Sequence, residues 1–404
     1  MKIKNTLRHS FSPHFVIPAS LFVIPASLSV IPAKAGIQFL IFFFLLSSFL
    51  SAKTTFSGYL KSLDLVSNYK ALSGNRGRLE GEWQDKNKNF DLRLVTDHEF
   101  LFGPLLSSQK KSVSALIPED EFLDLVWVLN EKENSIWRHS FHRAYFTTKW
   151  NELEGKVGRQ RIAWGQGRIW NPLDVINPYN PLSVEKDERL GSDSIAIKNY
   201  FSELSFLEAV YVPKKNFRGE NSILLGRYRV NFRQMDWGVV GGKKGEELLF
   251  GFDSAAQIVE GSLRTEAAYI WGSNLRKDFF RAVLSYDYSF TNTLYLLGEL
   301  YYNGIGENKK ENYSKVVLKR GEQNFLGQTY FGFVSRYDFT PLWIGSCYGI
   351  VNNNDSSLFL SPKIEWKALT DLELSLAYHA FLGSSASEFG PLQEVAFFQI
   401  QWFY

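Results

Sequence analysis

The sequence predicts an all-β fold, a transmembrane antiparallel β-barrel of about 18 strands, on three observations. The chain ends in a strand with an apolar face of Phe398, Ile400, Trp402 and Tyr404. Strand after strand carries charged residues on one face only, which is typical of a wall with a hydrated side. Long and short connections alternate along the chain, as they do between the two ends of a membrane barrel.

The composition agrees with this fold class. Of the 404 residues, 16% are aromatic, which is too many for a disordered chain. The mean hydropathy of −0.17 is too low for a bundle of membrane helices. A barrel accommodates both values, because it hides a polar lumen behind an apolar belt and concentrates aromatic residues at the two membrane interfaces.

The N-terminus predicts export. Residues 39–50 form the one continuous apolar stretch, which has the length of a signal-peptide core and is short for a bilayer span. Ser51 and Ala52 suit a signal peptidase, so we expect a repeat-containing leader and cleaved signal peptide over 1–52 and an outer-membrane barrel over 53–404. A single membrane anchor is the alternative.

The segment before the apolar stretch repeats a VIPA motif every seven residues, at 16–20, 23–27 and 30–34. Each proline interrupts helix and strand pairing. We interpret the repeat as translated repetitive DNA upstream of the true start. N-terminal sequencing of a form that begins within residues 1–33 would contradict this interpretation.

Charge and cysteine content exclude several classes of function. Without residues 1–52 the chain has 41 basic and 42 acidic residues, a balance of −1, so we expect no nucleic-acid partner. Cys347 is the one cysteine, which excludes an intrachain disulfide and a cysteine-based metal site. His139 and His142 are three apart, on opposite faces of a strand, and make a poor metal pair. We expect no metal and no cofactor.

Four segments alternate clearly, at 90–97, 143–150, 227–232 and 371–380. In the last of these, leucines and Tyr378 occupy one face and polar residues the other. The polar faces of the four segments carry charges of both signs: Asp91, Arg93, Asp97, Arg143, Lys149, Arg227, Arg229, Asp371 and Glu373. Further lumen candidates are Arg264, Glu266 and Glu299. Such a lining indicates a wet interior with weak ion selectivity.

The connections set the strand number. Short turns are expected at 85–89, 151–152, 233–234, 291–293 and 369–370, and long loops at 101–137, 164–190 and 304–324. The two kinds alternate if 101–137 is one excursion. Residues 122–129 then belong to that loop or pair as a hairpin that protrudes from it. This count predicts 18 strands; 16 and 20 remain open.

Residues 158–191, GRQRIAWGQGRIWNPLDVINPYNPLSVEKDERLG, resemble a segment of porin-like bacterial outer-membrane proteins near the alginate-export and phosphate-selective porins. The last strand resembles the closing strand of bacterial outer-membrane barrels, whose terminal aromatic residue is part of their insertion signal. The resemblance implies a porin-like barrel, inserted by the barrel-assembly machinery through Phe398, Ile400, Trp402 and Tyr404. It implies no substrate.

The loop at 164–190 is the candidate constriction. Gly165 and Gly167 allow the strand to end abruptly, and Pro172 and Pro178 stiffen the residues around them. A stiff polar loop of this length can fold into the lumen and narrow it. Candidate pore and constriction residues are Arg143, Arg159, Arg161, Arg168, Asp174, Arg189, Arg227 and Arg229. Alternatively, these arginines only pair with lumen acids and hold the loop.

The sequence therefore predicts a channel for passive diffusion of small polar or anionic solutes, and no enzyme. The main alternative is a barrel that binds or exports surface polysaccharide, with Tyr145, Tyr295 and Tyr301 stacking on sugars. A barrel-embedded lipid-modifying enzyme is the third. Expected partners are outer-membrane lipid and lipopolysaccharide, the latter contacted by the basic loop at 304–324.

Overall fold

The computed structural model describes residues 53–107, 121–178, 180–185, 191–215, 222–273, 276–316 and 325–404. The expected leader over 1–52 and the candidate Arg189 lie outside these residues. The strands are β1 (Lys53–Ser67), β2 (Lys70–Gln84), β3 (Phe90–Phe102), β4 (Val126–Lys132), β5 (Ser135–Trp150), β6 (Leu153–Gln160), β7 (Ser192–Ser202), β8 (Ser205–Val212), β9 (Ile223–Phe232), β10 (Met235–Lys244), β11 (Glu247–Ile258), β12 (Gly261–Trp271), β13 (Phe279–Ser289), β14 (Tyr295–Asn303), β15 (Thr329–Asp338), β16 (Trp343–Asn352), β17 (Ser357–Leu369), β18 (Leu372–Leu382) and β19 (Val395–Phe403). A short 3₁₀ helix, η3, covers Lys310–Lys315.

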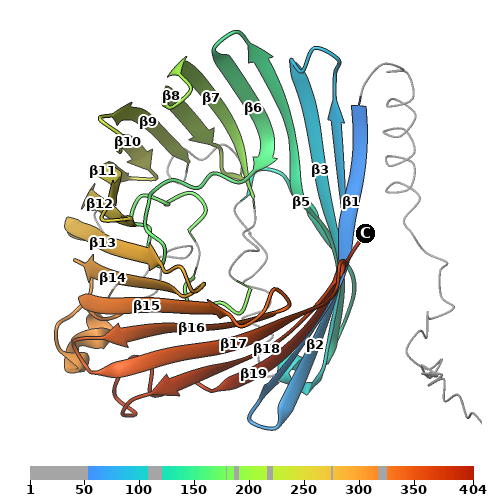
Figure 1. Cartoon of the computed structure of the whole chain (residues 1–404), viewed down its shortest axis with the longest axis vertical. Helices are drawn as coiled ribbons and strands as arrows, with labels where there is room; N and C mark the ends of the chain where they lie inside the picture. The colour runs from blue at the N-terminus through green and yellow to red at the C-terminus, as the bar shows by residue number, and fades with distance from the viewer. Residues whose placement is uncertain are drawn as a thin grey trace, which may run out of the picture. The chain divides into compact units, whose positions relative to one another are not determined.

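The strands form one closed antiparallel barrel (Figure 1). Each wall strand pairs with its neighbour along the chain, and β19 pairs with β1 in a register that sets Phe403 opposite Tyr59. The strand β4 pairs with β5 alone, so the wall consists of the other 18 strands. The predicted barrel and its strand number are confirmed. Closure leaves no unpaired strand edge in the wall.

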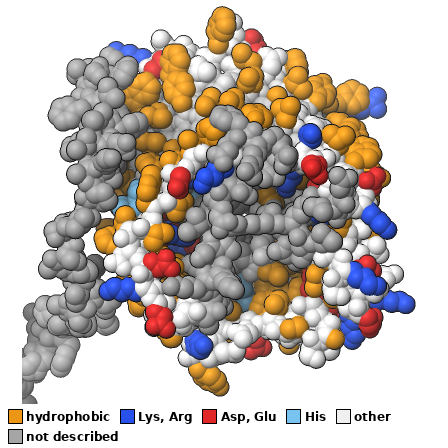
Figure 2. Space-filling view, turned by 180° about the vertical axis from the view of Figure 1, so that it is seen from behind, with side chains coloured by type: hydrophobic (Ala, Val, Ile, Leu, Met, Phe, Trp, Pro, Cys, Tyr) orange, Lys and Arg blue, Asp and Glu red, His pale blue; other side chains and the backbone are white. Residues whose placement is uncertain are grey.

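Side chains alternate between the two faces of the wall. On β18, Leu376 and Tyr378 are exposed on the outside, whereas Ser375 and His379 are buried inside. The same division holds around the ring, and hydrophobic side chains lie along its outer perimeter in Figure 2. An apolar outer face around a polar interior is the arrangement of membrane barrels. Among the described residues, no helix has the length and apolar character needed to cross a membrane.

The connections alternate in part as predicted, but the long-loop end also has two-residue turns at 68–69 and 245–246. Eight short turns lie at the same end as residues 53 and 404, and the long loops lie at the other end. The turn expected at 369–370 lies one residue later, because β17 continues to Leu369 and β18 begins at Leu372. The loop expected to begin at 164 begins directly after Gln160, because β6 is only eight residues long. The positive φ of Gly158 (122°) marks the irregular end of this strand.

The segment before β5 forms the predicted hairpin. One edge of β5 pairs with β3 along most of its length. The other edge pairs with β4 in its first half and with β6 in its second half. β4 therefore pairs with the part of the β5 edge that lies beyond the end of β6. Backbone groups inside a membrane barrel need internal partners, so β4 supplies the hydrogen bonds that the shortened β6 cannot.

The C-terminal strand has the predicted apolar face. Phe398, Ile400 and Trp402 are 37%, 38% and 48% exposed, on the outside of the wall. Tyr404 exchanges two backbone hydrogen bonds with Gly58 of β1, both 3.1 Å long. Its hydroxyl donates to the carbonyl oxygen of Arg78 at 2.7 Å. The last residue therefore takes part in closing the barrel; its role as an insertion signal stays a prediction.

Candidate functional site: a loop docked inside the barrel

The chain enters the barrel after β6. In Figure 1 the green segment that comes after β6 runs across the inside of the ring rather than along its rim. We call its described part, 161–178 and 180–185, the lumen loop. Its apolar side chains pack against the inner wall: Ile162, Trp164 and Leu173 belong to a buried cluster with residues of β7 to β13. Ile169 and Trp170 belong to a second cluster with residues of β13 to β17.

Two glycines of the inner wall make room for these side chains. A Cβ atom at Gly251 on β11 would lie 2.1 Å from Cδ2 of Leu173. A Cβ atom at Gly332 on β15 would lie 2.5 Å from Cδ1 of Ile169 and 2.8 Å from the Trp170 ring. The loop thus occupies the space that side chains at these two positions would fill, and its fit depends on glycine there.

Two buried carboxylates face the turn of the loop. Glu266 on β12 accepts hydrogen bonds from the backbone N–H groups of Gln166 (2.8 Å), Gly167 (3.2 Å) and Leu173 (2.6 Å). Glu299 on β14 accepts from the N–H groups of Arg168 (2.8 Å), Ile169 (3.0 Å) and Trp170 (2.6 Å). Gly165, with a φ of 97°, provides the sharp turn that aims these N–H groups at the wall. Six backbone donors are satisfied by two side chains.

The far end of the loop contacts the opposite part of the ring. Glu185 lies 2.5 Å from Nζ of Lys61 on β1 and 3.0 Å from Nη2 of Arg76 on β2. Burial alone would raise the pKa of the Glu185 carboxyl, but the positive charges of Arg76 and Lys61 outweigh it and lower the pKa below its usual value. The loop is therefore attached to β12 and β14 at one end and to β1 and β2 at the other.

A network of paired charges covers the wall beside Glu185. Arg76 also bonds Glu99 on β3 at 2.7 Å, and Arg138 on β5 bonds the other oxygen of Glu99 at 2.5 Å. Arg78 bonds Asp97 through two nitrogens. Sequence reasoning singled out Asp97 but neither of the β2 arginines. The alternation of Arg76, Arg78, Glu80 and Glu82 with Gly and apolar residues was the signal that would have found them.

The predicted constriction residues fall into three groups. Arg161 and Arg168 have exposed side chains on the lumen loop, and Arg143 and Arg229 are half-buried on the inner wall. Arg229 lies 2.7 Å from Asp236. The remaining described candidates are buried: Arg159, Asp174 and Arg227.

The buried candidates have partners in the structure. Arg159 bonds Asp193 of β7 at 2.9 Å and the carbonyl oxygen of Leu123 at 2.7 Å. Asp174 accepts a long hydrogen bond from the N–H of Asn177, and Arg227 lies 3.5 Å from Asp253. Asp193 was not singled out from the sequence, because its partner Arg159 is 34 residues away and no local pattern links the two.

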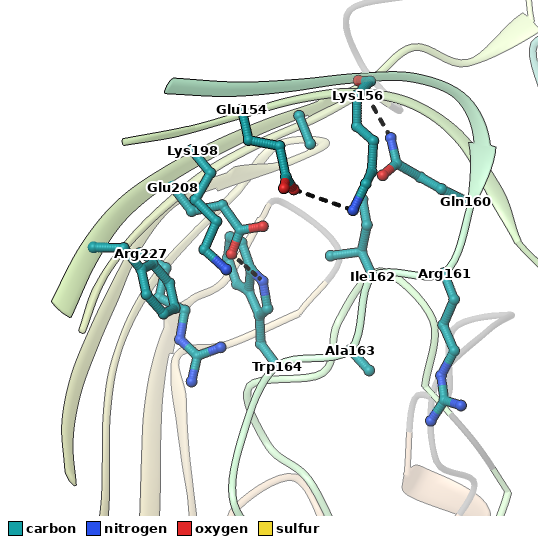
Figure 3. Close-up of a pocket in the computed structure, with 12 residues that line it drawn as sticks. Glu154, Lys156, Gln160, Arg161, Ile162, Ala163, Trp164, Lys198, Glu208 and Arg227 are labelled. Carbon is teal, nitrogen blue, oxygen red and sulfur yellow. Dashed lines mark hydrogen bonds and ion pairs between the residues drawn. The ribbon is translucent and has the colours of Figure 1, made fainter. Parts of the chain in front are cut away.

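A polar recess of about 200 Å³ lies between the start of the loop and β6 to β9 (Figure 3). The indole N–H of Trp164 donates to Glu208 at 3.1 Å. Lys156 pairs with Glu154 at 3.2 Å, and the ammonium of Lys198 lies 3.8 Å from the centre of the Phe206 ring. Charges of both signs therefore line this part of the interior.

A closed 18-stranded barrel with an apolar outside, a polar inside and an inserted loop has the architecture of a porin. The chain is similar in structure to the outer membrane protein OpdK of Pseudomonas aeruginosa, with a TM-score of 0.55 and 10% identity over 88% of this chain and 98% of that one. OccAB3 of Acinetobacter baumannii gives 0.54 and 10%, over 87% and 99%. OccD3 (OpdP) of P. aeruginosa gives 0.54 and 10%, over 87% and 91%. These likenesses show a shared barrel fold. No family model matches the chain. No curated protein matches it in sequence.

Proposed function

We propose that this chain is an outer-membrane channel through which small polar or anionic solutes diffuse, and that the lumen loop narrows its path. The observation that carries the proposal is the docking of 161–178 inside a closed barrel of porin size. A barrel of 18 strands is wide enough for an aqueous channel, so a loop held across its inside limits what passes. Diffusion through such a path needs no cofactor and no catalytic residue.

The exposed charges of the lumen loop favour anions. Several charged side chains of the wall are buried in ion pairs, as Arg78 is with Asp97 and Arg264 with Asp287. Arg161 and Arg168 have exposed side chains on the lumen loop. Guanidinium groups bind carboxylate or phosphate with two donors, so two exposed arginines at the narrowing select weakly for anions. We propose that these two carry the selectivity, that Asp174 helps to hold the loop through Asn177, and that Arg159 stabilises the wall through Asp193.

The remaining expectations rest on the same architecture. An apolar outer face requires a membrane, and the outer membrane is the bilayer that contains such barrels. We propose that residues 1–52 are a leader removed on export and that the apolar face of β19 is read by the barrel-assembly machinery. Lipopolysaccharide at the long-loop end is the proposed outside neighbour.

Single-channel recording in planar bilayers tests this function. We expect discrete open steps and a reversal potential in a salt gradient that shows modest anion preference. Arg161→Ala and Arg168→Ala should each lower that preference, whereas Lys86→Ala in the exposed turn at the other end should leave it unchanged. Silence of a folded, inserted barrel would contradict the channel and favour a barrel that binds or exports polysaccharide.

A further inference from the structure

Two carboxylates of the inner wall are almost fully buried against the lumen loop. Glu266 is 1% exposed and Glu299 is fully buried, although both side chains are on the inner face of a barrel with a polar interior. Six backbone N–H groups of the lumen loop donate to their carboxylates. We infer that Glu266 and Glu299 are positioning residues for the channel, which hold the lumen loop against the wall and thereby set the width and charge of the path. This inference rests on the proposed function.

The geometry requires a carboxylate at each position. In Glu266, Oε2 accepts from Gln166 and Gly167 while Oε1 accepts from Leu173. In Glu299 both oxygens are likewise used. A carboxylate offers acceptors on both oxygens, whereas an amide presents an NH₂ group on one side. Glutamine would therefore point a donor at a backbone donor and lose at least one bond at each site.

The two carboxylates act on one continuous turn. Residues 166–170 give five of the six N–H donors, and no β-ladder partner is available to a turn that has left the wall. Successive N–H groups that point to one side form a cradle for negative charge. Here the charge belongs to the wall instead of a ligand, so docking of the loop satisfies both the buried carboxylates and the turn.

Shape reinforces this attachment independently of charge. Leu173 occupies the space over Gly251, next to the bonds made to Glu266, and Ile169 and Trp170 occupy the space over Gly332, next to those made to Glu299. The Trp170 ring also stacks on Tyr301 of β14, with 5.1 Å between ring centres. Each carboxylate thus lies beside a hole that the same stretch of loop fills. We therefore infer that the lumen loop is a fixed narrowing of the path through the barrel and not a mobile gate.

Accessibility of a buried thiol tests the inference without relying on conduction. Cys347→Ser removes the native thiol, and Ile169→Cys places one at a position that is fully buried in the docked loop. Reaction with a water-soluble maleimide should be slow in this parent. Adding Glu266→Gln and Glu299→Gln should raise the rate about tenfold or more, because two or more hydrogen bonds to charged groups are lost. Glu373→Gln, a lumen carboxylate on β18, is the matched control.

Conductance gives the second readout. The double glutamine variant should show larger and noisier open steps and a weaker anion preference, because Arg161 and Arg168 move with the loop. Barrel closure should persist, seen as retained β-structure in circular dichroism and retained heat-dependent mobility on gels. Glu299→Asp, which keeps the charge but withdraws it by one methylene, should give an intermediate labelling rate and covers the case in which glutamine prevents folding.

The outcomes separate the two proposals. A labelling rate in the folded double variant or in Glu299→Asp that equals the control would overturn the positioning role. Faster labelling in a barrel that never conducts would uphold the positioning role and overturn the channel. Faster labelling with larger steps supports both.

Discussion

Lys61 on β1 and Glu185 on the lumen loop lie 2.5 Å apart, Nζ to Oε1, inside the barrel. The same strand β1 closes the ring by pairing with β19. The loop is thus attached to the seam of the barrel as well as to Glu266 and Glu299 on the other side. Because Arg76 bonds the second oxygen of Glu185, the attachment depends on the charge of one carboxylate.

Acid should release this end of the loop. The pKa of Glu185 in the folded barrel is lower than its unperturbed pKa of 4.5. The ion pairing is therefore fully present above pH 4.5 and is lost as the pH falls through the lower pKa of the folded state. We expect conductance to stay constant from pH 7 to pH 5 and to rise below 4.5. Glu185→Gln should show the larger conductance already at pH 7 and no step in acid. A step of equal size in this variant would contradict the assignment.

Loss of Arg159 should destabilise the barrel without altering its selectivity. Arg159 is 4% exposed and pairs with the equally buried Asp193, so Arg159→Ala leaves a negative charge buried without its partner. Breaking such a pair costs about 3–5 kcal/mol. We expect a lower unfolding temperature by circular dichroism in detergent. Adding Asp193→Ala should recover part of the loss, and an unchanged reversal potential is expected in both variants.

Raising the pH from 5 to 8 should weaken the contacts that Glu388 makes at the long-loop end of the barrel. Its carboxylate accepts from the N–H of Leu326 (2.7 Å), the hydroxyl of Tyr330 (2.6 Å) and the amide of Asn352 (2.7 Å). Burial, assisted by Asp355, raises the pKa of Glu388 to about 7 despite these hydrogen bonds.

The raised pKa determines the sign of this effect. Stability from Glu388 is fully present below 4.5 and is lost as the pH rises to about 7, by about 1.4 kcal/mol for each pH unit in that window. Denaturant unfolding at pH 5 and pH 8 measures the loss. Glu388→Gln should remove this part of the pH dependence. A wild-type barrel that loses no more stability than this variant between pH 5 and pH 8 would contradict the prediction.

Deletion of Tyr404 should impair closure. The residue makes two backbone hydrogen bonds to Gly58 and one side-chain hydrogen bond to Arg78, worth roughly 1 kcal/mol each. We expect a smaller fraction of heat-resistant, folded barrel after refolding into detergent. Tyr404→Phe keeps the ring and the backbone bonds and should lose far less. Equal yields for the deletion and the wild type would rule out a role in closure.

Much of the wall was predictable because strand side chains alternate with a period of two. The outward Leu376 and the inward Ser375 are explained by that period alone, as is the apolar face that Trp402 shares with Phe398. Turn residues between such segments set the strand number. The hairpin at β4 was predictable as an alternative, although its use as a replacement for the end of β6 was not.

The site was less predictable. Arg159 and Arg161 are two residues apart and look equivalent on a strand, yet β6 ends at Gln160 between them. Arg159 stays in the wall as one half of a buried pair, and Arg161 enters the lumen with an exposed side chain. Where a strand ends depends on what the next segment can pack against, which local pattern does not contain.

Local periodicity and the positions of glycine and proline were enough to specify a closed barrel, its apolar belt and a stiff inserted loop. The docking of that loop and the choice of charges that remain exposed depend on the closed ring. The bonds from Gln166 to Glu266 and from Arg168 to Glu299 join residues 100 and 131 positions apart. Such partners meet only when the ring closes, since closure brings distant strands around one interior.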